Sequence, residues 1–236
     1  MGTIGNFRPE TLDLRPRPLR AVLFDWDGTL VDSAEVSFRC YAQVFGAYGI
    51  AFDRARFAAT YSPDWYQTYE AVALPREHWS AADARWVELY GEERAELLPG
   101  AGDGLARLRA AGLATALVTS GSRPRIDREL AALGAAGLFE CVVCCEDVSS
   151  RKPDPAPLLL ALERIGVEPA AAAYVGDSPE DILMARAAGA FALGIEGGFP
   201  NREALRASKP DLLAVDLASA IDGLLVEQMP KRSRGE

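Results

Sequence analysis

Short apolar runs alternate with amphipathic stretches over most of the chain. Six runs have the length and composition of buried strands: 20–26, 114–119, 140–145, 172–176, 190–195 and 211–215. Between them, hydrophobic residues at helical spacing predict helices over 102–111, 124–133, 155–165 and 179–188, each followed closely by glycine. This alternation is typical of an α/β fold, in which helices flank a parallel sheet.

The stretch 33–98 interrupts the alternation. It carries Tyr, Trp, Ala and Glu at helical spacing and no convincing strand, which indicates a helical insert after the first strand. The predicted organisation is a core formed by 20–32 and 99–227, the insert over 33–98, and loose extensions at 1–19 and 228–236.

Composition and charge narrow the class of protein. With 236 residues, 49% of them hydrophobic and 25% charged, the chain has the composition of a globular protein of one large domain, or one domain with a lid. It has no apolar run of the roughly 18 residues that a membrane span needs, and no apolar secretory segment near its start, so we expect a cytoplasmic protein. The formal net charge of −9 argues against nucleic acid or an anionic membrane as partner. We expect a monomer or homodimer that binds a small ligand.

Three of the four cysteines, Cys141, Cys144 and Cys145, lie in one short apolar run, and the first two have Cys-x-x-Cys spacing. In a buried strand, residues three apart point to opposite faces and cannot chelate one ion. We therefore interpret these cysteines as core residues of a reducing compartment rather than as a metal or redox site.

The first candidate site is FDWDGTLVDS, residues 24–33, which follows directly on an apolar run. Asp25 and Asp27 leave the carboxyl end of a predicted strand, where open α/β sheets bind their ligands. Two buried carboxylates this close repel each other unless a cation or a proton lies between them. Oxygen ligands favour Mg²⁺, whereas a solvated acidic turn is the alternative without function.

A second acidic cluster, GDSPED over 176–181, also follows a predicted strand. Asp177 lies at the strand end, and Asp181 lies one helical turn later. A metal site and a helix start both explain this segment, because Asp177 or Ser178 can cap a helix that has Pro179 at its first position. The placement of both clusters at one sheet edge favours the metal site.

Two further segments offer groups that bind an oxyanion. Thr119, Ser120 and Gly121 follow a predicted strand and present a hydroxyl and backbone N–H groups, although simple helix capping would use the same residues. Lys152 is one of three lysines beside 22 arginines, and a compact ammonium suits contact with both a phosphoryl oxygen and a carboxylate. A solvated surface lysine is the alternative.

These residues occur in the order of four signature motifs, and the set over about 20–225 resembles the haloacid dehalogenase-like hydrolase superfamily. The resemblance is to its phosphoglycolate phosphatase-like and β-phosphoglucomutase-like branch. It implies a Rossmann-like sheet with a helical cap at 33–98, and a small phosphorylated metabolite as substrate.

The resemblance also implies roles. Asp25 would be the nucleophile that forms an aspartyl-phosphate, and Asp27 the general acid and then the base. Phosphoryl oxygens would be held by Thr119, by the Ser120 amide and by the Gly121 turn, with Lys152 neutralising their charge. Magnesium would be bound by the Asp25 carboxylate, the Asp27 carbonyl and Asp177, with Asp181 in support.

Residue identities exclude some relatives. The dehalogenases of the superfamily lack an acid at Asp27, and its phosphonatases use a cap lysine, which 33–98 does not contain. A β-phosphoglucomutase-like phosphotransferase and a phospho-accepting regulatory domain stay as alternatives. In the cap, the resemblance implies that the substrate is contacted by Tyr61, Ser62, Trp65 and Tyr66.

Overall fold

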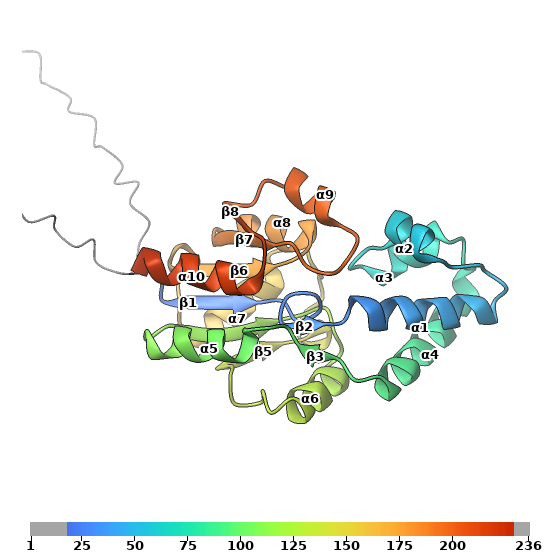
Figure 1. Ribbon diagram of the computed structural model, residues 1–236, viewed down its shortest axis with the longest axis horizontal. Coiled ribbons are helices and arrows are strands. Elements are labelled where there is room, and N and C mark those ends of the chain that lie inside the picture. The colour runs from blue at the N-terminus through green and yellow to red at the C-terminus, as the bar shows by residue number, and fades with distance from the viewer. Residues whose placement is uncertain (1–17, 229–236) are drawn as a thin grey trace, which may run out of the picture.

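The computed structural model describes residues 18–228 and is built on one parallel sheet (Figure 1). Its strand order is β5-β4-β1-β6-β7-β8, with β1 at the centre. The strands are β1 (Ala21–Phe24), β4 (Ala114–Val118), β5 (Cys141–Val143), β6 (Ala172–Gly176), β7 (Phe191–Ile195) and β8 (Leu212–Ala214). All six predicted strands are confirmed, most of them a residue or more shorter at the ends.

Helices cover both faces of this sheet, which explains why its central strands are apolar throughout. Val22 and Phe24 of β1 pack in one core with side chains of α5 (Ala101–Ala110), α6 (Arg123–Ala132) and α10 (Leu217–Gln228). Ala21 and Leu23 point the other way, into a core shared with α7 (Ala156–Ile165), α8 (Pro179–Ala188) and α9 (Arg202–Ala207). The predicted α/β fold is thereby confirmed, and the alternation of side chains along β1 assigns its residues to two cores.

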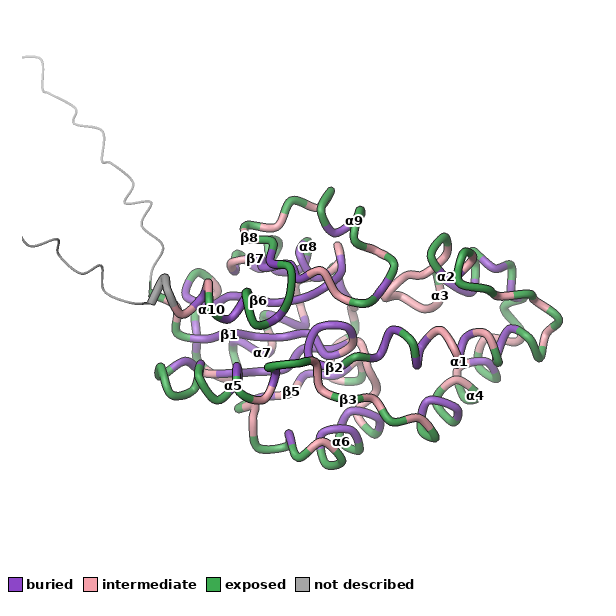
Figure 2. Tube along the Cα trace, in the orientation of Figure 1, coloured by how far each residue is buried: buried purple, intermediate pink, exposed green. Residues whose placement is uncertain are grey.

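A helical insert lies beyond one end of the sheet, on the right of Figure 1. It comprises α1 (Ala34–Ala47), α2 (Arg54–Thr60), α3 (Trp65–Ala71) and α4 (Trp79–Glu92). A third core, rich in aromatic residues, holds these helices together. Figure 2 shows the insert as helices whose buried sides face one another and whose exposed sides face outward.

The insert is joined to the sheet by two short strands, β2 (Val31–Asp32) and β3 (Glu96–Leu97), which pair antiparallel. The expectation of no strand within 33–98 is wrong at β3, because a two-residue strand has no apolar run that would reveal it. Gln228, expected in the loose tail, lies in α10. The rest of that tail, and 1–17 of the predicted N-terminal extension, lie outside the described residues.

Cys141 and Cys144 are core residues, as interpreted from the sequence, whereas Cys145 is only partly buried and lines a cavity. Cys141 packs in the core on one face of the sheet and Cys144 in the core on the other, and both are buried with free thiols. Their side chains therefore cannot bind one ion. Within 18–228, no helix combines the length and the apolar character that crossing a membrane requires.

Candidate active site

The candidate site lies at the carboxyl edge of the sheet, where three strands end side by side. Asp25 follows β1, Thr119 follows β4 and Asp177 follows β6. The hydrogen bonds between β1 and β6 continue one residue past β1, since the Asp25 amide donates to the Val175 carbonyl at 2.9 Å. The parallel register thus brings residues together that are far apart in sequence, as the strand pattern predicts.

Lys152 enters this edge from the loop between β5 and α7. Its Nζ donates to Asp25 Oδ1 at 2.6 Å and to Asp181 Oδ1 at 2.8 Å. Burial alone would lower the pKa of Lys152, but Asp181 and Asp25 outweigh it, and the pKa lies above its usual range. The lysine is therefore a fixed positive charge between two carboxylates, not a solvated surface residue.

Three buried carboxylates lie close together, and Lys152 contacts two of them. Oxygen atoms of Asp25, Asp177 and Asp181 all lie within 4.8 Å of one another. Burial raises the pKa of Asp25 to about 7, against the opposing effect of Lys152, and burial with the neighbouring Asp25 and Asp181 raises the pKa of Asp177 well above its usual range. Such a cluster has more negative charge than Lys152 can balance, so it favours binding of a cation.

Asp177 is the member of the cluster with a buried oxygen, Oδ2, that receives no hydrogen bond from the described residues. Two glycines make room for it: a Cβ on Gly28 would lie 2.3 Å from that oxygen, and a Cβ on Gly197 would lie 2.7 Å from it. A buried carboxylate oxygen without a donor is a costly arrangement. The oxygen donors and this free atom fit a hard divalent cation such as Mg²⁺.

Asp181 differs from Asp177, because protein donors satisfy both of its oxygens. Oδ1 accepts from Lys152 and from the Tyr174 hydroxyl at 3.3 Å, and Oδ2 accepts from the Ser178 hydroxyl at 2.7 Å. The Ser178 hydroxyl in turn accepts from the Asp181 amide, which makes a capping box at the start of α8. The capping interpretation is correct for Ser178. Asp181 contributes to the cluster by holding Lys152 and Ser178 in place.

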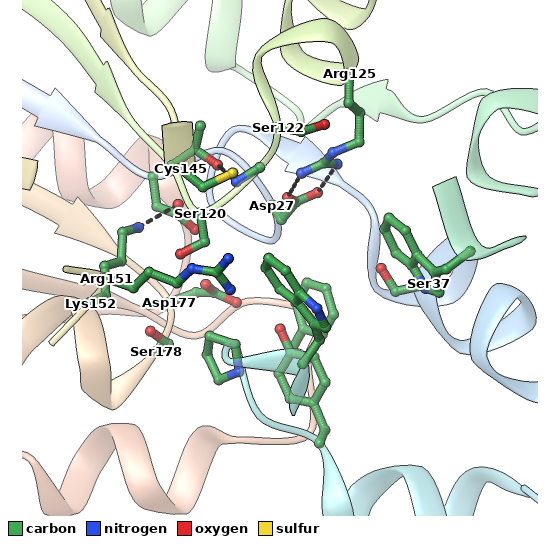
Figure 3. Close-up of a pocket in the computed structure, with 18 of the residues that line it drawn as sticks. Asp27, Ser37, Ser120, Ser122, Arg125, Cys145, Arg151, Lys152, Asp177 and Ser178 are labelled. Atoms are coloured by element: carbon green, nitrogen blue, oxygen red, sulfur yellow. Dashed lines mark hydrogen bonds and ion pairs between the residues drawn. The ribbon is translucent and has the colours of Figure 1, made fainter. Parts of the chain in front are cut away.

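Asp27 does not join this cluster. Figure 3 shows its carboxylate facing Arg125 of α6, which donates from both terminal nitrogens, one at 3.1 Å. The Tyr90 hydroxyl of the insert lies 3.4 Å from the same carboxylate. Burial acts to raise the pKa of Asp27, but Arg125 outweighs it, and the pKa lies below the usual range. Asp27 is thus an ionised carboxylate that Arg125 holds in place.

Arg125 was not among the predicted site residues. It is buried, it lies over the Tyr90 ring at 4.9 Å, and it contacts Glu129, which accepts a hydrogen bond from the Trp26 indole at 2.6 Å. The spacing of Arg125 and Glu129 within one helix was a signal for an ion pair only. Its connection to Asp27 depends on how α6 packs, which the sequence pattern does not specify.

The loop after β4 lines the cavity with Thr119, Ser120 and Gly121, as predicted, and with Ser122. Thr119 Oγ1 accepts from the Gly121 amide at 3.0 Å. Ser122 is the N-cap residue of α6, so the helix-capping alternative is wrong for Thr119 and Ser120. Gly121 is needed for space, because a Cβ there would lie 2.4 Å from a nitrogen of Arg125.

The insert forms the opposite wall of the cavity, which has a volume of about 220 Å³. Of the four residues predicted on this side, Tyr61 and Trp65 line it and Ser62 and Tyr66 do not. The Tyr66 hydroxyl donates to Asp83 at 3.0 Å, and the Ser62 amide donates to the Thr68 hydroxyl at 3.0 Å. Pro63, which belongs to the same segment 61–66, also lines the cavity. Further wall residues, which the sequence did not suggest, are Tyr41, Trp86, Arg151 and Phe199.

Fold and site together define the class: an α/β enzyme whose acidic pocket, with one buried lysine, lies at a sheet edge under a helical insert. The model of the haloacid dehalogenase-like hydrolases matches residues 22–195. The chain belongs to this family, and the resemblance that its four motifs suggested is confirmed.

Comparisons with individual proteins agree. A phosphoglycolate phosphatase of Yersinia pseudotuberculosis is 32% identical over 218 residues, which cover 88% of this chain and 94% of the relative. CbbY from Rhodobacter sphaeroides, solved in complex with phosphate, is 27% identical with a TM-score of 0.70, over 85% of this chain and 95% of that one. The structure of a predicted phosphoglycolate phosphatase from Haemophilus somnus, 24% identical, has the same fold with a TM-score of 0.77, over 86% and 97% of the two chains.

Proposed function

We propose that this protein is a Mg²⁺-dependent phosphatase that hydrolyses a small phosphomonoester through an aspartyl-phosphate on Asp25. The observation that carries the proposal is the contact of Asp25 with the buried Lys152, beside an Asp177 oxygen to which no residue of 18–228 donates. The names of the relatives support a substrate similar to phosphoglycolate.

In the first step, a carboxylate oxygen of Asp25 attacks phosphorus as the bond to the ester oxygen breaks. Lys152 holds Asp25 through Oδ1, which leaves Oδ2 as the attacking atom. Its ammonium also offsets the negative charge that the incoming phosphoryl group brings. Thr119, the Ser120 amide and the Gly121 turn would hold the phosphoryl oxygens, and all three residues line the cavity.

Asp27 would give a proton to the leaving alkoxide and then take one from the water that attacks the aspartyl-phosphate. That attack releases inorganic phosphate and regenerates Asp25. The role comes from the family resemblance, and the position of Asp27 on the cavity wall is compatible with it. Its contact with Arg125 keeps the carboxylate ionised in the free enzyme, so Asp27 would leave Arg125 and take up a proton from solvent before it acts as the acid.

The metal would be held by Asp25, by Asp177 and by the main-chain carbonyl of Asp27. Bound there, Mg²⁺ supplies charge stabilisation for the phosphoryl oxygens. Asp181 positions Lys152 and supports the cluster through its capping box. We also propose that the segment 33–98 acts as a cap on a core of 20–32 and 99–227, and that it keeps water from the attack on the ester.

Turnover of p-nitrophenyl phosphate and 2-phosphoglycolate with Mg²⁺ tests this function. We expect many product equivalents per protein molecule, and loss of activity in EDTA that Mg²⁺ restores. Asp25→Asn should lower the rate to below about 1% of wild type, because a covalent step is lost. Asp103→Asn, on the exposed side of α5, is the matched control and should keep the wild-type rate.

Other results would identify the alternatives. One equivalent of phosphate retained per protein molecule would indicate a phospho-accepting regulatory domain. Transfer of the phosphoryl group to a sugar phosphate faster than to water would indicate a β-phosphoglucomutase-like phosphotransferase. Full activity of Asp25→Asn, or full activity without metal, would contradict the proposed mechanism.

A further inference from the structure

Three cationic side chains line the cavity, and they differ in their partners. Lys152 contacts Asp25 and Asp181, and Arg125 contacts Asp27 and Glu129. Arg151 has no carboxylate within 4.0 Å among residues 18–228. It is therefore the cavity arginine whose N–H donors are not used by an acidic residue of the described chain.

Arg151 and its sequence neighbour Lys152 both line the cavity, but their side chains point to different parts of it. Figure 3 shows the two side chains diverging from one loop, Lys152 along the sheet edge and Arg151 toward the aromatic wall. Its guanidinium carbon lies 4.1 Å from the ring centre of Trp65, a residue of the insert. Stacking of this kind uses the face of the guanidinium and leaves the N–H groups at its edge for an acceptor.

Asp83, the acidic residue of the insert among those that line the cavity, does not accept from Arg151. Its two carboxylate oxygens accept instead from the hydroxyls of Tyr69 at 2.9 Å and Tyr66 at 3.0 Å. The insert as a whole is acidic, with ten acidic residues against six arginines over 34–97. An anion near the insert side of the cavity would therefore be attracted by Arg151, a cation that the core supplies.

We propose that Arg151 binds a second anionic group of the substrate, so that the enzyme selects short phosphomonoesters that carry a carboxylate or a second phosphate. This inference rests on the proposed function, which places the reacting phosphoryl group at Asp25 and Lys152. Since Arg151 and Lys152 line the same cavity of about 220 Å³, the two anions of the substrate would be separated by a short carbon chain. A planar guanidinium matches a carboxylate or phosphate with two parallel hydrogen bonds.

The position of Arg151 also links substrate binding to the insert. Its guanidinium lies between the core loop that carries it and Trp65 of the insert. An anion bound at its edge would lower the freedom of both side chains, which favours the arrangement in which insert and core are in contact.

The test compares substrates that differ in the second anion. These are 2-phosphoglycolate, its neutral counterpart 2-hydroxyethyl phosphate, and the bisphosphate of ethane-1,2-diol. With Mg²⁺ present, we expect wild-type kcat/KM to favour at least one of the anionic substrates over the neutral one. Arg151→Gln should reduce this preference about tenfold or more, mainly through KM, because a charge-assisted pair of hydrogen bonds is lost. The substrate that loses most identifies the anion.

Two further variants keep the test decisive. Arg151→Lys keeps the charge and should restore only part of the preference, since an ammonium cannot make the paired contact. Arg76→Gln is the control: Arg76 also stacks on a tryptophan of the insert, Trp79 at 5.2 Å, but it pairs with Glu70 and does not line the cavity. It should keep the wild-type preference.

The outcomes separate this inference from the function on which it rests. If the wild type hydrolyses none of the three compounds, the proposed function fails and the inference fails with it. If it hydrolyses them without preferring an anionic one, the inference alone is overturned. The same conclusion holds if Arg151→Gln changes the preference less than twofold, or no more than Arg76→Gln does.

Discussion

Gly28 shows how one residue without a side chain makes the acidic cluster possible. Its φ of +76° lies in the left-handed region, which other residues seldom adopt. A Cβ at this position would also lie 2.3 Å from Asp177 Oδ2 and 2.7 Å from the Phe199 ring. The turn between Asp27 and Thr29 therefore needs glycine for two separate reasons, one in the backbone and one in the site.

These two reasons can be separated by mutation. We expect Gly28→Ala to lose the increase in Tm that Mg²⁺ gives the wild type, because the new Cβ displaces the Asp177 carboxylate. Gly112→Ala is the control, since Gly112 has a φ of +81° and no atom within 4 Å of its ideal Cβ. Both variants should lose stability through backbone strain, by about 1 kcal/mol. Equal Mg²⁺-dependent Tm shifts in the two variants would contradict the assignment of Asp177 to the metal.

Asp147 connects the loop after β5, which leads to Arg151 and Lys152, with helices α6 and α7. It ends the short 3₁₀ turn Cys145–Asp147 after β5, and its Oδ2 accepts from the Cys144 amide at 2.8 Å. The same oxygen contacts Arg123 at the start of α6, and Oδ1 lies 3.4 Å from Arg164 of α7. The loop that leads to Arg151 and Lys152 thus begins at an anchored carboxylate.

This anchor predicts a dependence of stability on pH. Burial would raise the pKa of Asp147, but the Cys144 amide and Arg123 outweigh it, and the folded pKa lies below the ordinary value. The stabilising contribution is therefore complete above the unfolded pKa of about 3.9 and is lost as pH falls through the lower, folded pKa. Asp147→Asn should cost about 1–2 kcal/mol at pH 7.

Urea unfolding at several pH values measures this effect. The difference between wild type and Asp147→Asn should shrink below about pH 4, where the carboxylate becomes protonated in the unfolded chain while the folded protein still holds it ionised. Asp127→Asn is the control, because Asp127 faces the same Arg123 at 3.7 Å but is 61% exposed; it should change stability little. A difference that stays constant down to pH 3 would show that the Asp147 charge does not stabilise the fold.

The elements also show which features the sequence could predict. Strands β1 and β6 are buried on both faces, so their apolar runs are continuous, and the acids that follow them mark the sheet edge. By contrast, Arg125 and Arg151 are two of 22 arginines, and the residues around them give no periodic signal. Their place on the cavity depends on how α6 and the insert pack. The same holds for Ser62 and Tyr66, which do not line the cavity although their neighbours Tyr61 and Trp65 do.

At the scale of the whole molecule, aromatic side chains form the contact between the insert and the sheet. Phe199, in the loop after β7, packs in the core of the insert, and its ring lies 4.5 Å from that of Tyr61 at an interplanar angle of 15°. Two cation–π contacts also join the insert to the core: Arg151 lies over the Trp65 ring, and Arg125 lies over the Tyr90 ring. The covalent connection is limited to the paired strands β2 and β3. Contact between the two parts therefore depends on a few rings.

Removal of the Phe199 ring should shift the insert toward an open arrangement. The lost stacking is worth about 0.5–1.5 kcal/mol, so Phe199→Ala should raise KM up to about tenfold by lowering the population that binds substrate tightly. Trp65 would become more exposed even without substrate, which acrylamide quenching of tryptophan fluorescence can measure. Adding Trp65→Phe should remove the extra quenching.

Phe139→Ala is the matched control for this experiment. Phe139 contacts Trp26 edge-on at 6.5 Å within the sheet's own core, so its loss should lower Tm without changing KM or the exposure of Trp65. If Phe199→Ala raises KM while quenching stays at the wild-type level, the ring acts on substrate directly and not through the insert. Because Phe199 also lines the cavity, quenching in the absence of substrate is the measurement that decides between contact and closure.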